Sequence, residues 1–151
     1  MMGRTQQAVA RIAAALWAGG LWAIGYAVAP LLFARLPLAL AGGLAGRLFA
    51  IWQGLGLLFG GIVFVSVRHR ARPWPVLASL AWALDAGFEL ILLPVMASLK
   101  GPHFGPASPH WHVFLILHGV AAACYLVEGL LVLALVAGGV VKTNGTQLVD
   151  G

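Results

Sequence analysis

Three acidic residues stand inside otherwise apolar stretches of the chain and are the first candidates for chemistry. Asp85 and Glu89 occur in LDAGFELILLP, and Glu128 occurs in LVEGLL. If these stretches are helices, Asp85 and Glu89 lie one turn apart on the same face. An acid at the centre of a membrane helix costs about 2.5–3.5 kcal/mol, so it almost always faces the interior of a helix bundle. The spacing therefore predicts an interior acidic site.

Such a site could bind or transport a proton or another cation. Loss of hydration and repulsion between neighbouring carboxylates both favour the protonated acid, so an arriving cation would displace protons. The competing interpretation is structural: each acid is protonated and hydrogen-bonded to a neighbouring helix, with Ser79 or Trp82 as partners. The residues alone support both interpretations.

A polar stripe on the last apolar stretch extends the acidic site toward one end. It shares an arc of about 120° on a helical wheel and contains Phe114, His118, Ala121, Tyr125 and Glu128. His118 precedes Glu128 by ten residues, or about 15 Å at 1.5 Å per residue. We expect Arg47, near the start of the second apolar stretch, at a similar level. Arg47 and His118 would then form an outer gate, although His118 could also be an interior histidine satisfied by one hydrogen bond.

A second set of candidate ligands lies in the loop KGPHFGPASPHWH. His110 and His112 are two residues apart, and His103 could fold back toward them. Three imidazoles could bind a borderline or soft metal, with Met96 as a soft donor one turn inward. The loop has no cysteine or acid, and its prolines favour an exposed segment without metal.

The composition places all these candidates in a membrane. The chain has 151 residues, is 62% hydrophobic and 9% charged, and has a mean hydropathy of +0.97, whereas a soluble domain is about 25% charged. The apolar stretches predict an all-α, four-transmembrane-helix bundle within residues 1–142, because a spanning helix needs about 20 residues. The expected helices are 12–33, 44–67, 76–99 and 113–141. Residues 143–151 are expected to be a disordered polar tail.

The basic residues indicate lipid headgroups rather than nucleic acid, because they are scattered or sit in the turn RHRARPWP. One side of the bundle would carry Arg4, Arg11, Arg68, Arg70, Arg72 and Lys142, and the other Arg35, Arg47 and Lys100. The positive-inside rule then predicts cytoplasmic termini and a multi-pass protein of the cell inner (plasma) membrane. Gly56 and Gly60 have the small-xxx-small spacing of close helix contacts, within the chain or in a homo-oligomer or with a membrane protein partner.

Two segments carry a resemblance to a known family. They are GGLWAIGYAVAPLLFARLPLALAGGLAGRLF, residues 19–49, and LHGVAAACYLVEGLL, residues 117–131, and together they resemble the DUF4149, or TMEM205-like, family. The matching features are Pro30 and Phe33 closing the first helix, a small-residue start to the second, Pro94 closing the third and LHG opening the fourth. Ala121 to Ala123 depart from the pattern, since a serine is expected there as a hydroxyl partner for His118.

The resemblance implies an integral membrane protein without an assigned enzymatic activity. Eukaryotic members of the family are linked to resistance to platinum drugs, which implies export or sequestration of a soft-metal species. The architecture is also similar to the CopD-like group, including the haem-binding HemJ type, which implies a haem b oxidoreductase with His118 as one axial ligand. His118 is the only histidine expected inside the bundle, whereas a haem between helices normally has two strong axial ligands, so we expect no cofactor. A non-catalytic assembly factor is the remaining alternative.

Overall fold

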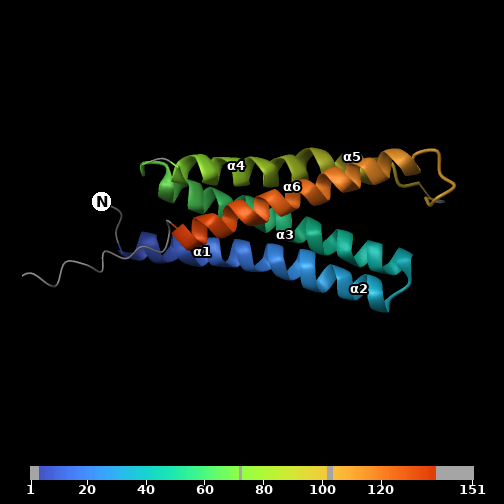
Figure 1. The fold of residues 1–151 in the computed structure, drawn as a ribbon, viewed down its shortest axis with the longest axis horizontal. Helices are drawn as coiled ribbons and strands as arrows, with labels where there is room; N and C mark the ends of the chain where they lie inside the picture. Colours follow the sequence, from blue (N-terminus) through green and yellow to red (C-terminus); the bar gives the residue numbers. More distant parts are fainter. Residues whose placement is uncertain (1–3, 72, 102–103, 139–151) are drawn as a thin grey trace, which may run out of the picture.

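The computed structural model describes residues 4–71, 73–101 and 104–138, and this part of the chain is helical apart from its turns (Figure 1). Within it, four helices are long and apolar enough to cross a membrane: Thr5–Arg35, Leu38–Val67, Trp74–Ser98 and Trp111–Gly138. The predicted all-α class with four membrane-spanning helices is confirmed. The tail at 143–151 lies outside the described residues.

Two of the four spanning helices contain a π-helical turn. The first consists of α1 (Arg4–Trp22), η1 (Ala23–Val28) and α2 (Ala29–Arg35). The second is α3 (Leu38–Val67). The third consists of α4 (Trp74–Gly87), η2 (Phe88–Leu92) and α5 (Leu93–Ser98), and the fourth is α6 (Trp111–Gly138).

Prolines explain the two π-helical turns. Pro30 and Pro94 each follow such a turn, near the start of the next α-helical segment. Proline has no N–H, and its ring crowds the carbonyl four residues earlier. Membrane helices accommodate proline by local π adjustments, and here the N–H of Ala29 donates to Ile24 O and that of Leu93 to Phe88 O, five residues earlier in each case. The helices therefore continue through the apolar layer without a break.

The spanning helices form a closed antiparallel ring. α1 packs against α3, α3 against α4, α4 against α6, and α6 returns to α1 (Figure 1). The start of α1 and the end of α6 lie at the same end of the bundle as the turn between α3 and α4. Toward the other end, α2 stays with α3 and α5 with α6, and these two pairs diverge. Which end faces the cytoplasm stays a prediction.

Small residues make room for large aromatic side chains in the core. A Cβ atom at Gly60 would lie 2.5 Å from Trp82 Cδ1 and 2.9 Å from the Trp17 ring, and one at Gly20 would overlap the Trp52 ring. The small-xxx-small spacing of α3 thus admits side chains from neighbouring helices. The Trp82 indole occupies space at Gly60 that the Cβ atom of an alanine would take up.

Substitution of Gly60 by alanine should therefore lower the free energy of unfolding by roughly 1–3 kcal/mol, the usual cost of overpacking a core. Gly54→Ala on the same helix is the matched control, because nothing lies within 4 Å of its added Cβ. The control should be neutral or gain up to about 1 kcal/mol from helix propensity. Denaturation of the purified protein in detergent measures both, and an equal loss in the two variants would contradict this account of the core.

Candidate functional site

Glu128 in α6 is the most completely bonded acid of the bundle. Its side chain is 1% exposed, and its carboxyl oxygens accept hydrogen bonds from Trp17 Nε1 at 3.1 Å and from Gln53 Nε2 at 3.2 Å. Trp17 belongs to α1 and Gln53 to α3, so one carboxyl group connects three helices. The predicted interior position of Glu128 is confirmed.

The partners predicted for the acids are wrong. The exposed Ser79 hydroxyl donates to Pro75 O on its own helix, and Trp82 Nε1 donates to Leu57 O at 2.9 Å. Trp17 is one of six tryptophans in the chain, and no sequence motif singles it out as the donor. Gln53 did have a signal, because it is the single carboxamide in the apolar helix α3, and a buried amide requires a polar partner.

Asp85 in α4 is as buried as Glu128, but no donor among the described residues bonds to it. It is 0% exposed, and both carboxyl oxygens lack a hydrogen-bond partner among the described residues. A Cβ atom at Gly56 would lie 2.8 Å from each of these oxygens, so the carboxyl group rests directly on the α3 backbone. Glu128 and Glu89 are close enough to interact with Asp85 electrostatically. Its predicted interior position is confirmed.

The side chain of Glu89 is less buried than its spacing from Asp85 predicts. It is partly exposed, and its Oε2 atom is buried without a hydrogen-bond partner among the described residues. Glu89 lies in η2, where the backbone widens from an α to a π turn. The 3.6-residue repeat that would place Glu89 on the face of Asp85 ends there.

Each spanning helix contributes one polar residue to a central layer, which we call the acceptor cluster: Trp17, Gln53, Asp85 and Glu128. Besides the two Asp85 oxygens, Gln53 Oε1 is buried without a partner among the described residues. Tyr125, one turn from Glu128, does not supply a proton to the cluster, because its hydroxyl donates to Leu21 O at 2.8 Å. Oxygen acceptors therefore outnumber the donors that serve them.

The proposed gate residues are not brought to the acceptor cluster. Arg47 and His118 are both exposed, and the His118 ring stacks on Phe114 with centroids 5.9 Å apart. The expectation of an interior histidine is wrong. The arc that faces the core at Ala121 and Tyr125 turns to the surface at His118, because α6 and α3 belong to helix pairs that diverge at this end (Figure 1).

The candidate metal ligands are also dispersed. His110 and His112 are exposed, and His103 lies outside the described residues. Met96 is buried against Phe88 and Ala121, where it fills apolar space. In the described ranges, no group of three or more His, Cys, Asp or Glu side chains is placed to hold a metal ion.

A haem between the helices does not fit the described side chains. The histidines that the structure describes, at positions 69, 110, 112 and 118, are all exposed on the surface. An interior iron would require at least one axial ligand that faces the core. Among the described residues, the side chains of the acceptor cluster offer oxygen atoms, one carboxamide N–H group and one indole N–H instead.

Substitution of Trp17 by phenylalanine tests the bond to Glu128. We expect a loss of about 1–2 kcal/mol in unfolding free energy, the worth of an interhelical hydrogen bond in model membrane systems. Trp52→Phe is the matched control, because Trp52 Nε1 is buried without a partner among the described residues. In a Glu128→Leu background the cost of Trp17→Phe should shrink markedly. If that cost persists unchanged, ring packing rather than the hydrogen bond explains it.

Comparison with known proteins agrees with this architecture. Residues 12–104, more than half of the 151 residues, match the family described as Domain of unknown function (DUF4149). The matched range runs from α1 through the third spanning helix and includes Trp17, Gln53 and Asp85 of the acceptor cluster. No curated protein and no solved structure matches the chain. By the extent of the family match, this multi-pass membrane protein belongs to the DUF4149 family.

Proposed function

We propose that the protein binds protons at the acceptor cluster and passes them through the bundle. The observation that carries the proposal is Asp85, whose two carboxyl oxygens are fully buried and receive no hydrogen bond from the described residues. An ionised carboxylate that is fully buried and receives no hydrogen bond from the described residues is energetically costly. A bound proton removes the charge and supplies the missing donor.

The different hydrogen bonding of Asp85 and Glu128 indicates which of the two acids is protonated first. Glu128 accepts two hydrogen bonds, which stabilise its ionised form, whereas Asp85 accepts none from the described residues. Two coupled carboxyl groups in unlike environments favour a state with one proton, held by the less well solvated group. In this proposal Asp85 holds the proton and Glu128 holds the negative charge. Gln53 Oε1, an unpaired acceptor, can accept a hydrogen bond from the protonated acid or from water.

Oxygen ligands favour a proton or a hard cation over a soft metal. Gln53, Asp85 and Glu128 offer carboxyl and amide oxygens, which suit hard cations, whereas soft metals select thiolate and thioether ligands. Export of a soft-metal species, which the TMEM205-like resemblance suggests, would use a different ligand chemistry. We therefore place proton binding first and hard-cation binding second.

The proposal also includes the orientation of the bundle in the membrane and its association with other chains. The basic residues of α1 and of the turn after α3 support cytoplasmic termini in the cell inner membrane. Four helices enclose a narrow core, and the core space beside the glycines is taken by aromatic rings. A homo-oligomer or a membrane protein partner would complete a path for ions.

Infrared spectroscopy tests proton binding directly, because the chain has only four acidic residues. In reconstituted protein at neutral pH we expect a carboxylic-acid C=O band that Asp85→Asn removes. This band should lie at higher wavenumber than that of protonated Glu128 in acid, because hydrogen bonds from Trp17 and Gln53 weaken the C=O bond. Glu89→Gln should leave the Asp85 band in place. If wild-type protein shows no acid band at neutral pH, Asp85 is ionised and the proposal is wrong.

Proton movement is measured in vesicles that contain a pH-sensitive dye and the reconstituted protein. With an imposed membrane potential, Asp85→Asn should lower proton uptake at least tenfold, to the rate of empty vesicles. Ser79→Ala on the same helix is the control, because its exposed hydroxyl bonds only to its own helix. Replacing sodium with a large organic cation should leave the rate unchanged. A rate that follows sodium would assign the site to a hard cation, and an unchanged rate in Asp85→Asn would rule out transport through this residue.

A further inference from the structure

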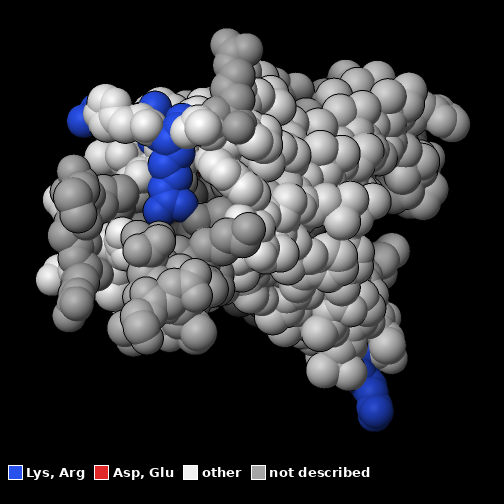
Figure 2. All heavy atoms as spheres, turned by 60° about the vertical axis from the view of Figure 1, so that its left-hand side comes forward, with Lys and Arg blue, Asp and Glu red and all other residues white. Residues whose placement is uncertain are grey.

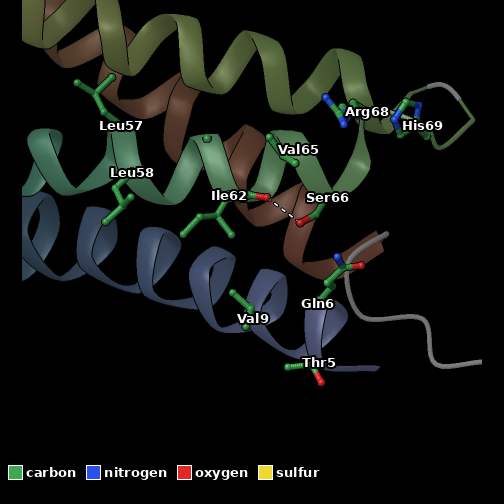
Figure 3. Close-up of a pocket in the computed structure, with 11 residues that line it drawn as sticks. Thr5, Gln6, Val9, Leu57, Leu58, Ile62, Val65, Ser66, Arg68 and His69 are labelled. Atoms are coloured by element: carbon green, nitrogen blue, oxygen red, sulfur yellow. Dashed lines mark hydrogen bonds between the residues drawn. The ribbon is translucent and has the colours of Figure 1, made fainter. Parts of the chain in front are cut away.

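A groove outside the ring of helices lies beside the arginine-bearing turn that follows α3. It has a volume of about 720 Å³ and lies between the start of α1 and the second half of α3 (Figure 3). The acceptor cluster is not part of it, since none of its four residues lines the groove. A molecule bound in the groove would therefore not contact the acceptor cluster.

The walls of the groove are aliphatic and face outward. Val9 from α1 and Leu58, Ile62 and Val65 from α3 line it, and Val9, Leu58 and Val65 are each about half exposed. A surface of this kind on a membrane-spanning bundle is in contact with acyl chains.

The length of the groove corresponds to one leaflet. Its lining runs along α3 from Leu57 to Arg68, which is about 16 Å at 1.5 Å per residue. The hydrocarbon core of a bilayer is about 30 Å thick, so the groove reaches from one membrane surface to near the middle. An acyl chain of a single leaflet matches this span.

The mouth of the groove is polar and basic. Arg68 and His69 lie at the end of α3, whereas the Thr5 side chain at the start of α1 points away from them (Figure 3). The acids of the described ranges lie far from this mouth, at Asp85, Glu89 and Glu128 in the middle of the spans. Figure 2 shows several basic side chains in its upper left part and another at its lower right, with no acidic side chain visible on the face it displays. A planar guanidinium at such a mouth is suited to bind a phosphate through paired hydrogen bonds.

We propose that this groove binds one anionic phospholipid from the leaflet on its side of the membrane. The phosphate lies on the Arg68 guanidinium, beside the imidazole of His69. One acyl chain lies along Leu58, Ile62 and Val65. Net positive charge at the mouth selects an anionic headgroup over a zwitterionic one.

The charge selectivity is tested with full-length, delipidated protein in maltoside detergent. Dioleoyl phosphatidylglycerol is titrated while native mass spectrometry counts bound lipid, and dioleoyl phosphatidylcholine serves as the comparison with identical chains. Arg68→Gln should weaken phosphatidylglycerol binding about fivefold, the effect of one basic residue near an anionic surface. Arg35→Gln is the matched control, since Arg35 is an exposed arginine at the opposite end. Equal binding of the two lipids, or equal losses in the two variants, would overturn the proposal.

A second pair of variants tests the acyl chain. Val65→Trp fills the groove, whereas Val113→Trp adds the same ring to a similarly exposed valine on α6; the two valines are 55% and 49% exposed. We expect Val65→Trp to weaken phosphatidylglycerol binding at least fivefold at an unchanged unfolding temperature, and Val113→Trp to leave the affinity unaltered. Sodium phosphate at matched ionic strength is the headgroup-only probe. If phosphate binds as tightly as the lipid, or if Val65→Trp leaves the phosphatidylglycerol affinity unchanged, the groove does not bind an acyl chain.

Discussion

The bundle depends on how it satisfies the carboxyl group of Glu128. Within the apolar layer of a membrane no water competes for hydrogen bonds, so a buried polar group must find its partners in the protein. Glu128 finds them on two other helices, through Trp17 and Gln53. Because both donors come from the middle of their helices, these bonds set the height of α1, α3 and α6 relative to one another. Asp85 then meets the α3 backbone at Gly56, and Trp82 meets it at Gly60.

Aromatic side chains perform two tasks in this arrangement. They fill the volume left open by glycine, and their polar atoms donate to groups on a neighbouring helix. Trp82 donates to Leu57 O, Tyr125 to Leu21 O and Trp22 to Gly129 O. Without a solvent-driven force between helices in lipid, packing and interhelical hydrogen bonds provide the association energy. Trp82 beside Gly60 provides both the packing contact and the interhelical hydrogen bond.

The two buried acids have different chemistry because their surroundings differ. Glu128 is held by donors and acts as a structural centre, whereas the Asp85 oxygens receive none from the described residues. Glu89, in the π turn that begins at Phe88, is partly exposed, unlike this pair. The lipid groove lies on the outside of α1 and α3, so the proposed proton site and the proposed lipid site involve different residues and can be tested independently.

Local properties of the chain were sufficient to predict the all-α class, the four spans and the burial of Asp85 and Glu128. Hydropathy and length decide whether a segment crosses a membrane, and an acid in such a segment avoids lipid. The partners of Glu128 and the exposed positions of Arg47 and His118 were decided by the tertiary structure. α6 is apolar on nearly every side, so its sequence pattern distinguishes its core face poorly from its lipid face. Lipid and protein interior are equally apolar surroundings for a side chain, so hydropathy alone does not show which face of a helix meets another helix. The rotation of each helix about its axis and the divergence of the helix pairs determine which polar residues meet.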